Sequence, residues 1–157
     1  MIYHGLVSSY LRYGVTTWGS AKSTALEKLN SLHKRAIKII SPSNLICESA
    51  YQSSKILTIE SIYQFELAKF IHTISVERNP KAFNSYILPI SHTYPTRLRE
   101  NGCYQLYKPR TELGKTLIKF KGVQYWNSLP KNIKDCGTSQ LFKLNMKKYL
   151  LANQRII

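Results

Sequence analysis

The sequence predicts a mainly α-helical protein with one small antiparallel β-hairpin, an α+β arrangement in which the helices come first. Apolar residues recur at helical spacing in residues 24–40, 58–74 and 141–151. Residues 103–108 and 116–121 instead alternate apolar with polar or basic side chains. A turn that begins at a proline separates these two segments, and this combination is typical of a hairpin.

The length of the chain suits one domain, because 157 residues can bury a real core. We expect a helical region over residues 1–90, followed by a basic loop, the hairpin, a Trp-Asn-Ser-Leu-Pro turn and a last helix over 91–157, packed as one compact unit. Leu6, Tyr10 and Tyr13 already lie at helical spacing before Gly14 interrupts them. A chain that opens within a helix is expected to be a piece of a longer polypeptide.

The helix over 24–40 is the most clearly marked. Thr24 and Glu27 predict a capping box at its start, and Ser41-Pro42 predicts its end. An apolar stripe for the core consists of Leu26, Leu29, Leu32, Ala36, Ile37 and Ile40. The other side carries Lys28, Lys34, Arg35 and Lys38, and it either lies along a phosphate backbone or is simply solvated. His33 predicts a partly buried or surface histidine without a ligand role, because no second ligand stands at i+4.

The middle of the chain predicts a short amphipathic segment over 48–53 and a long helix that begins at Thr58 and ends before Asn79-Pro80. Its apolar face is wide enough for a central helix that packs on more than one side. A connecting loop that is basic at its exit follows, up to Arg97.

The last third predicts the hairpin, with Gly122 ending its second strand. Tyr125 and Trp126 then fall in a short helix ended by Pro130, and we expect these rings to be buried anchors rather than stacking platforms for a ligand. Ser139 predicts the cap of the final helix, whose inward residues are Leu141, Leu144, Tyr149 and Leu151, with Lys143, Lys147 and Lys148 outward.

The charge is strongly positive: 23 Lys and Arg against 8 Asp and Glu give a net charge of +15. Residues 92–135 hold nine of these cations and three acids, whereas residues 61–91 hold three and two. Such an excess favours a polyanionic partner, with nucleic acid first, although lysine-rich faces are also common on ordinary solvated surfaces.

Other classes of protein are disfavoured. Cys47, Cys103 and Cys136 are far apart and form no metal-binding pattern, so they predict reduced structural thiols, no metal site and no cofactor. Neither a membrane-spanning stretch nor a signal peptide is present, which favours an intracellular protein, nuclear or cytoplasmic. One Asp and seven dispersed Glu do not suit two-metal catalysis, and no phosphate-binding loop or nucleophile elbow occurs. We therefore do not expect an enzyme.

Five groups of residues resemble a known family, and they span nearly the whole chain. They are Ser9–Gly14 with Trp18-Gly19, the helix Leu26–Ile40, the block Lys55–Leu67, the tract His92–Arg97, and Trp126–Pro130 followed by Phe142-Lys143 and Tyr149-Leu150. In this order they resemble the C-terminal end of non-LTR, LINE-type (Jockey-like) retrotransposon reverse transcriptases.

The resemblance implies a thumb-like helical region and a smaller α+β piece that follow the polymerase palm, the domain that would hold the catalytic carboxylates of this RNA-directed DNA polymerase. No catalytic residue is carried over. By this analogy the chain grips template–primer duplex or element RNA and works with an upstream palm domain. The implied contacts are Lys28, Lys34, Arg35, Lys38, Arg97, Arg99, Arg110, Lys115, Lys119 and Lys121. The zinc knuckle of some relatives is absent from the sequence. A second hypothesis is a domesticated protein-interaction module with an acidic partner, and an independent enzyme is a distant third.

Overall fold

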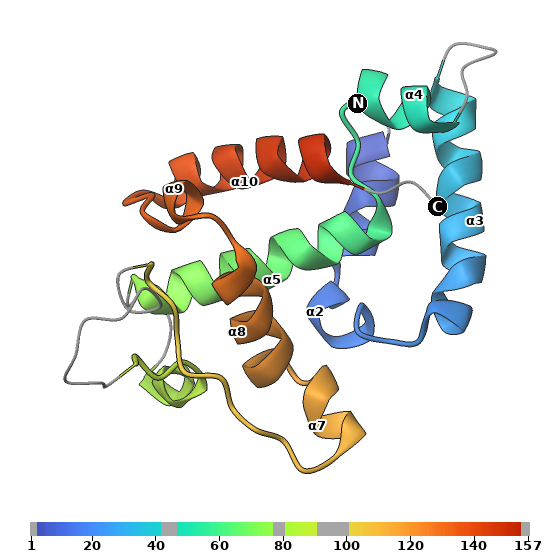
Figure 1. Ribbon diagram of the computed structural model, residues 1–157. Helices are drawn as coiled ribbons and strands as arrows, with labels where there is room; N and C mark the ends of the chain where they lie inside the picture. Colours follow the sequence, from blue (N-terminus) through green and yellow to red (C-terminus); the bar gives the residue numbers. More distant parts are fainter. Residues whose placement is uncertain (1–2, 42–46, 77–80, 91–100, 155–157) are drawn as a thin grey trace. The chain divides into compact units, whose positions relative to one another are not determined.

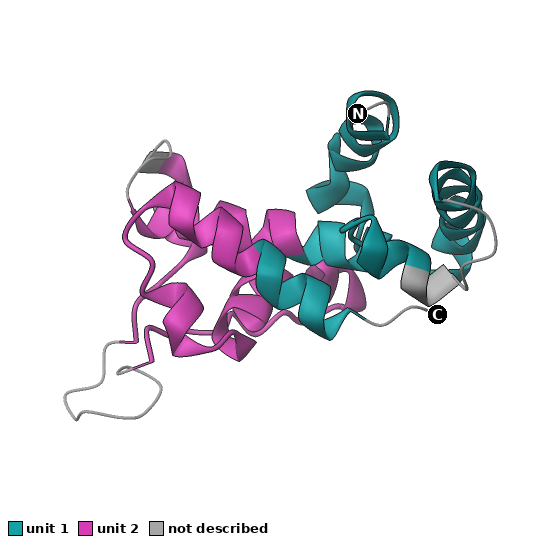
Figure 2. Cartoon of the chain, turned by 90° about the horizontal axis from the view of Figure 1, so that it is seen from above, with its two compact units in different colours: residues 1–64, 147–157 teal, residues 65–146 magenta. Residues whose placement is uncertain are grey.

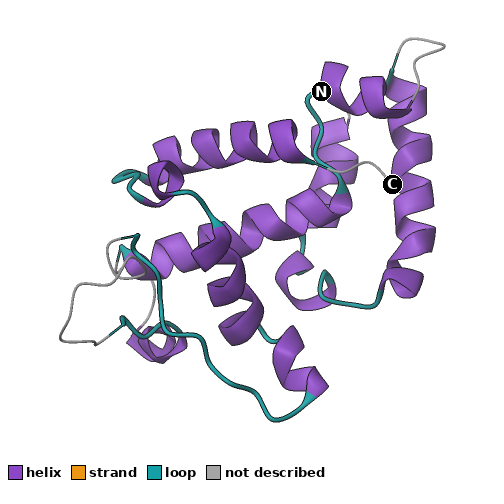
Figure 3. Cartoon of the chain, viewed as in Figure 1, coloured by secondary structure: helices purple, strands orange, loops and turns teal. Residues whose placement is uncertain are grey.

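The computed structural model describes residues 3–41, 47–76, 81–90 and 101–154 (Figure 1). Helices make up most of this part of the chain, and Figure 3 shows them joined by loops without a strand among the described residues. The mainly α-helical prediction is therefore confirmed at the level of class. The predicted contacts Arg97 and Arg99, and the predicted stop at Asn79-Pro80, lie outside the described residues.

The chain divides into two compact units, which Figure 2 distinguishes by colour. Unit 1 consists of residues 1–64 and 147–157, and unit 2 of residues 65–146. Two helices, α5 (Ile59–Ser75) and α10 (Ser139–Asn153), contribute residues to both. The compact units have bounds other than the predicted parts 1–90 and 91–157, whose division by role stays a prediction.

Unit 1 consists of one long helix, several short ones and parts of two more. Its elements are η1 (Tyr3–Ser8), α1 (Ser9–Arg12), α2 (Val15–Trp18), α3 (Ser23–Ile40) and α4 (Cys47–Ser53), with the start of α5 and the end of α10. Gly14 separates α1 from α2 with φ of 61°, a left-handed conformation that suits glycine, so the predicted interruption is confirmed.

Helix α3 contributes its two buried residues, His33 and Ile37, to the core of unit 1. Ile37 packs in a cluster that includes Tyr3 and Tyr51. Both rings also contact the histidine: Tyr3 Oη lies 2.6 Å from His33 Nε2, and Tyr51 Oη lies 3.2 Å from Nδ1. Burial lowers the pKa of His33 to about 4 and raises the pKa of Tyr3 to about 12, so His33 and Tyr3 are both neutral at pH 7.

The outer part of α3 differs from its prediction. The N-cap is Lys22, with no side-chain hydrogen bond, so the predicted Thr24–Glu27 capping box is wrong. Leu32 and Ile40, which were predicted for the core, are 59% and 46% exposed. The apolar residues of α3 are too many for one face, and unit 1 covers only the face around His33 and Ile37.

Unit 2 packs helices around the second part of α5. Its other elements are η2 (Lys81–Tyr86), α7 (Glu112–Thr116), α8 (Ile118–Ser128), α9 (Lys131–Lys134) and the first part of α10. In unit 2 the buried residues of α5 run from Phe65 to Ile74 and span an arc of about 180°, which agrees with the wide apolar face that was predicted. His72 of α5 stacks on Phe142 with ring centroids 4.2 Å apart, and Trp126 of α8 lies 5.9 Å from the same ring.

The predicted hairpin is wrong. Residues 116–121 instead form the end of α7 and the start of α8. A helix that continues beyond residue 121 buries Val123 and Trp126, whereas a strand that ended at Gly122 would not bury them. Gly122 does not end a strand. It allows close packing on α5, since a Cβ there would lie only 3.1 Å from Ile71 Cδ1. Residues 103–108 are extended, but their only ladder contact among the described residues is an isolated bridge between Pro89 and Tyr104.

The final helix is confirmed, but its inward face is partly wrong. Leu141 and Leu144 are 57% and 51% exposed, whereas Phe142, Met146 and Leu150 are buried. The sequence of α10 contains two apolar stripes at helical spacing, and only packing decides between them.

Candidate nucleic-acid interface

The Trp-Asn-Ser-Leu-Pro motif acts as a clamp in unit 2. The Asn127 side chain accepts a hydrogen bond from Tyr104 N at 2.9 Å and donates one to Tyr104 O at 2.8 Å. Trp126 Nε1 donates to Gly102 O at 3.0 Å. The motif therefore fixes the position of the extended segment that begins at Gly102. Trp126 is buried, as the sequence predicted, whereas Tyr125 is only half-buried.

Lys134 is buried against the Trp-Asn-Ser-Leu-Pro motif and is therefore not part of a ligand site. Lys134 is 9% exposed, and its Nζ donates to Asn127 O at 3.2 Å and lies 3.5 Å from Cys103 Sγ. Cys103 is buried and Cys136 half-buried, and both are free thiols. The described residues bring no three His, Cys, Asp or Glu side chains together in a way that could hold a metal ion.

The clamped segment continues into the wall of a pocket of about 380 Å³, which we call the Tyr107 pocket. Its lining residues are Tyr86, Leu88, Gln105, Leu106, Tyr107, Lys108 and Lys119. Lys119 Nζ lies 4.9 Å from the centroid of the Tyr107 ring, within the range of a cation–π contact. Gln105 N donates to Leu88 O at 2.8 Å and so holds two walls together.

Sequence reasoning identified Lys119 but missed Tyr107 and Lys108. Tyr107 is 46% exposed, which leaves part of its ring open to a ligand. The only local signal was the spacing of Tyr104, Tyr107 and Lys108 within 103–108, which was interpreted as strand alternation. The approach of Lys119 from α8 to this segment depends on tertiary packing.

The other predicted cations of unit 2 do not all gather at the pocket. Arg110 follows the lining residue Lys108 by two positions and is exposed. Lys121 is exposed on α8 but lies roughly 200° around the helix from Lys119, on a different side. Lys115 of α7 is ion-paired with Glu112, so its charge is partly compensated.

In unit 1 the predicted cations share one side of α3. Lys28, Arg35 and Lys38 are exposed and Lys34 is half-buried. At 100° per residue the four occupy an arc of roughly 120°, which also contains Glu27, so the arc has a net charge of +3. We call this arc the basic side of α3.

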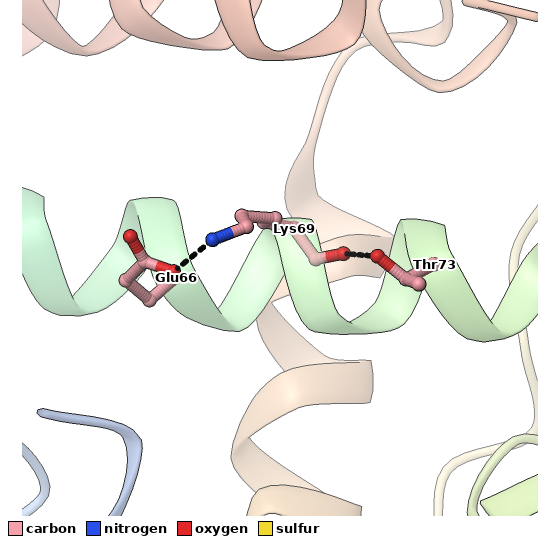
Figure 4. A network of polar contacts seen from close by, with 3 residues as sticks. All are labelled: Glu66, Lys69 and Thr73. Carbon is pink, nitrogen blue, oxygen red and sulfur yellow. Dashed lines mark hydrogen bonds and ion pairs between the residues drawn. The ribbon is translucent and has the colours of Figure 1, made fainter. Parts of the chain in front are cut away.

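Most of the predicted cations lack a compensating acid. No described carboxylate lies within 4.0 Å of Lys28, Lys34, Arg35, Lys38, Arg110, Lys119 or Lys121. Figure 4 shows the contrasting case on α5, where Lys69 Nζ lies 2.8 Å from Glu66 Oε2 and Thr73 Oγ1 donates to Lys69 O at 2.7 Å. The uncompensated cations are thus the four of the basic side of α3, Lys119 in the Tyr107 pocket, Arg110 two residues beyond its lining residue Lys108, and Lys121 on another side of α8.

Among the described residues, no helix combines the length and the apolar character that crossing a membrane requires. Comparisons with family models, with curated proteins and with solved structures give no match to this chain. The resemblance to LINE-type reverse transcriptases therefore rests on the sequence motifs alone.

Proposed function

We propose that this chain is a noncatalytic nucleic-acid-binding region of a retrotransposon reverse transcriptase, which grips element RNA or template–primer duplex while an upstream palm domain performs the polymerisation. The observation that supports it best is the set of seven predicted cations without a described carboxylate partner. Self-repulsion among such charges is relieved when a polyanion binds. The proposed setting is intracellular, nuclear or cytoplasmic.

The basic side of α3 suits a duplex backbone. From Lys28 to Lys38 it extends about 15 Å along the helix axis, a length over which a duplex presents roughly nine phosphate charges. The helix offers charges but few groups that could read base edges, so we expect weak sequence selectivity.

The Tyr107 pocket suits an unpaired nucleotide. It combines an exposed tyrosine ring and apolar walls with two lysines, Lys108 and Lys119. Aromatic rings that stack bases beside cations that hold phosphates are the usual elements of single-strand binding. RNA with single-stranded regions therefore offers a group for each surface, a duplex backbone for the basic side of α3 and an unpaired nucleotide for the Tyr107 pocket.

The test is binding of the full chain to a structured RNA with a single-stranded overhang, measured by fluorescence anisotropy across a series of salt concentrations. Three matched double variants each remove two positive charges. K34Q/K38Q alters the basic side of α3, K108Q/K119Q alters the Tyr107 pocket, and K131Q/K143Q is a control at exposed lysines outside both.

Each site variant should lower the slope of log K against log salt by about 1.4 to 1.8, since a released counterion contributes roughly 0.7 to 0.9. The control should change it by less than half of that. The K108Q/K119Q variant should lose more affinity for the overhang than for a blunt duplex. Absence of binding at low salt, or equal loss in all three variants, would contradict the proposal.

A further inference from the structure

A second surface of α3 is apolar and exposed. Ala25, Leu29, Leu32, Ala36 and Ile39 follow one another at alternating steps of four and three residues, the spacing of a coiled-coil seam. We call these five residues the α3 seam. Leu32 and Ile39 are 59% and 84% exposed, Ala25 is exposed, and Leu29 and Ala36 are half-buried.

The seam does not face the core of unit 1. Its mean direction lies about 120° around the helix from Ile37, which with His33 fixes α3 in that core. The anchoring side therefore adjoins the seam at His33 but does not include it, and the seam residues Ala25, Leu32 and Ile39 remain exposed. An apolar stripe of this regularity on an exposed helix marks a site of association.

The charges beside the seam are of one sign. When Leu29 and Ala36 are taken as a positions and the other three residues as d positions, Lys28 and Arg35 occupy the g positions. Both are exposed, and neither has a described carboxylate within 4.0 Å. The opposite flank, at the e positions, holds Leu26, His33 and Ile40. Glu27 falls on the far side of the helix and flanks nothing here.

These charges argue against a second copy of this chain as the occupant. Antiparallel pairing of two seams would bring g positions together and set Lys28 and Arg35 against cations. Parallel pairing would set them opposite His33 and Ile40, which offer no acid. A helix with acids at its flanking positions, by contrast, would pair with both cations while its apolar stripe covers Leu32 and Ile39.

We infer that the α3 seam is a docking site for an amphipathic helix of another protein, whose apolar stripe is flanked by Asp or Glu. The seam extends about 21 Å from Ala25 to Ile39, or four helical turns. The flanking cations Lys28 and Arg35 also belong to the basic side of α3, but the five seam residues include no predicted nucleic-acid contact, so the inference does not depend on whether nucleic acid binds.

The experiment titrates the full chain, after nuclease treatment, with three 21-residue peptides. The first carries Leu at a and d positions and Glu at e and g. The second has Lys in place of each Glu, and the third has the composition of the first in scrambled order. We expect the first to bind at least tenfold more tightly than either of the others.

The variants locate the binding. L32Q/I39Q should weaken the acidic peptide at least tenfold, while L141Q/L144Q, a matched change at exposed leucines of α10, should leave its affinity within twofold. K28E/R35E should reverse the preference toward the lysine peptide. K34Q/K38Q should reduce peptide affinity less than threefold, whereas L32Q/I39Q should leave RNA affinity within twofold.

Three results would overturn the inference. Equal binding of the scrambled peptide would show that charge alone attracts it, and an unchanged affinity in L32Q/I39Q would show that the seam is not used. A dimer in analytical ultracentrifugation that L32Q/I39Q abolishes would show that a second copy covers the seam. Circular dichroism of each variant would establish that it remains helical.

Discussion

Helices α3 and α8 have similar residue compositions but differ in how far their apolar side chains are buried. Both place lysines next to apolar residues, yet α8 buries Val123 and Trp126 and fits against α5 at Gly122. In α3, 18 residues long, only His33 and Ile37 are buried. The fold thus uses the large side chains of α8 for stability and leaves most of α3 available to ligands. Mixed apolar and basic composition alone does not distinguish the two cases.

The largest effect that would sharpen this comparison is the loss of the α8 anchor. Trp126→Ala should lower the free energy of unfolding by about 3–5 kcal/mol, because it removes a buried ring and its hydrogen bond to Gly102. Urea unfolding followed by circular dichroism measures this change. Leu117→Ala, at a 57% exposed position just before α8, is the control and should cost less than about 0.5 kcal/mol.

The stability of α3 within unit 1 should depend on pH. His33 has a pKa of about 4 in the folded chain and 6.5 in the unfolded chain, so the unfolded state binds more protons between these values. Its stabilising contribution is complete above pH 6.5 and should fall by about 3 kcal/mol as the pH drops through 4. Hydrogen exchange of the α3 amides, measured at pH values from 7 to 4 and corrected for the intrinsic exchange rate, should show this loss of protection.

The control for this prediction is His33→Gln, which cannot take up a proton in this range. It should be less stable at pH 7 but show a flatter pH dependence in α3. If both proteins lost protection equally on acidification, another group would be responsible.

A smaller effect is expected at the clamp. Asn127→Ala removes two hydrogen bonds to the backbone of Tyr104 and should cost about 1–3 kcal/mol. Ser128→Ala, the neighbouring change at an exposed hydroxyl that bonds only its own helix at Tyr125 O, is the comparison. Urea unfolding of the two variants should separate them, and equal stability would show that the clamp contributes little.

The smallest effect should occur on the α3 seam. Leu32→Gln and Ile39→Gln should each change the free energy of unfolding by no more than about 0.5 kcal/mol, because both side chains are exposed. Ile37→Ala on the same helix should cost about 2–5 kcal/mol, because that side chain is buried. A large loss of stability at Leu32 would mean that the seam supports the fold.

The sequence could predict α3, α5 and α10 as helices because their apolar periodicity is long or ends at clear stop signals, whereas α4 was predicted only as a short amphipathic segment. It failed at 116–121, where a few alternating residues fit a strand as well as the end of one helix and the start of another. It also failed on the inward face of α10, whose two apolar stripes are equivalent until Phe142 meets His72.

The candidate sites were predictable to a similar degree. That the cations of α3 are exposed follows from helical spacing. The contact of Lys119 with Tyr107, and the bonds of His33 to Tyr3 and Tyr51, join residues that are distant in the chain, and local patterns do not encode such contacts. Three residues of the exposed seam, Leu29, Leu32 and Ala36, were predicted for the core, because spacing shows that a face is apolar and not what covers it.

The bonds between Asn127 and Tyr104 have a consequence for how relatives of this chain would be recognised. The side-chain amide of Asn127 bonds both the N–H and the C=O of Tyr104, as a neighbouring strand would, and few other side chains can do this. The indole of Trp126 beside it has equally few substitutes. Descendants that changed their ligand would still keep these two residues in order to fold. A Trp-Asn pair at this place would then report on the fold and not on what each descendant binds.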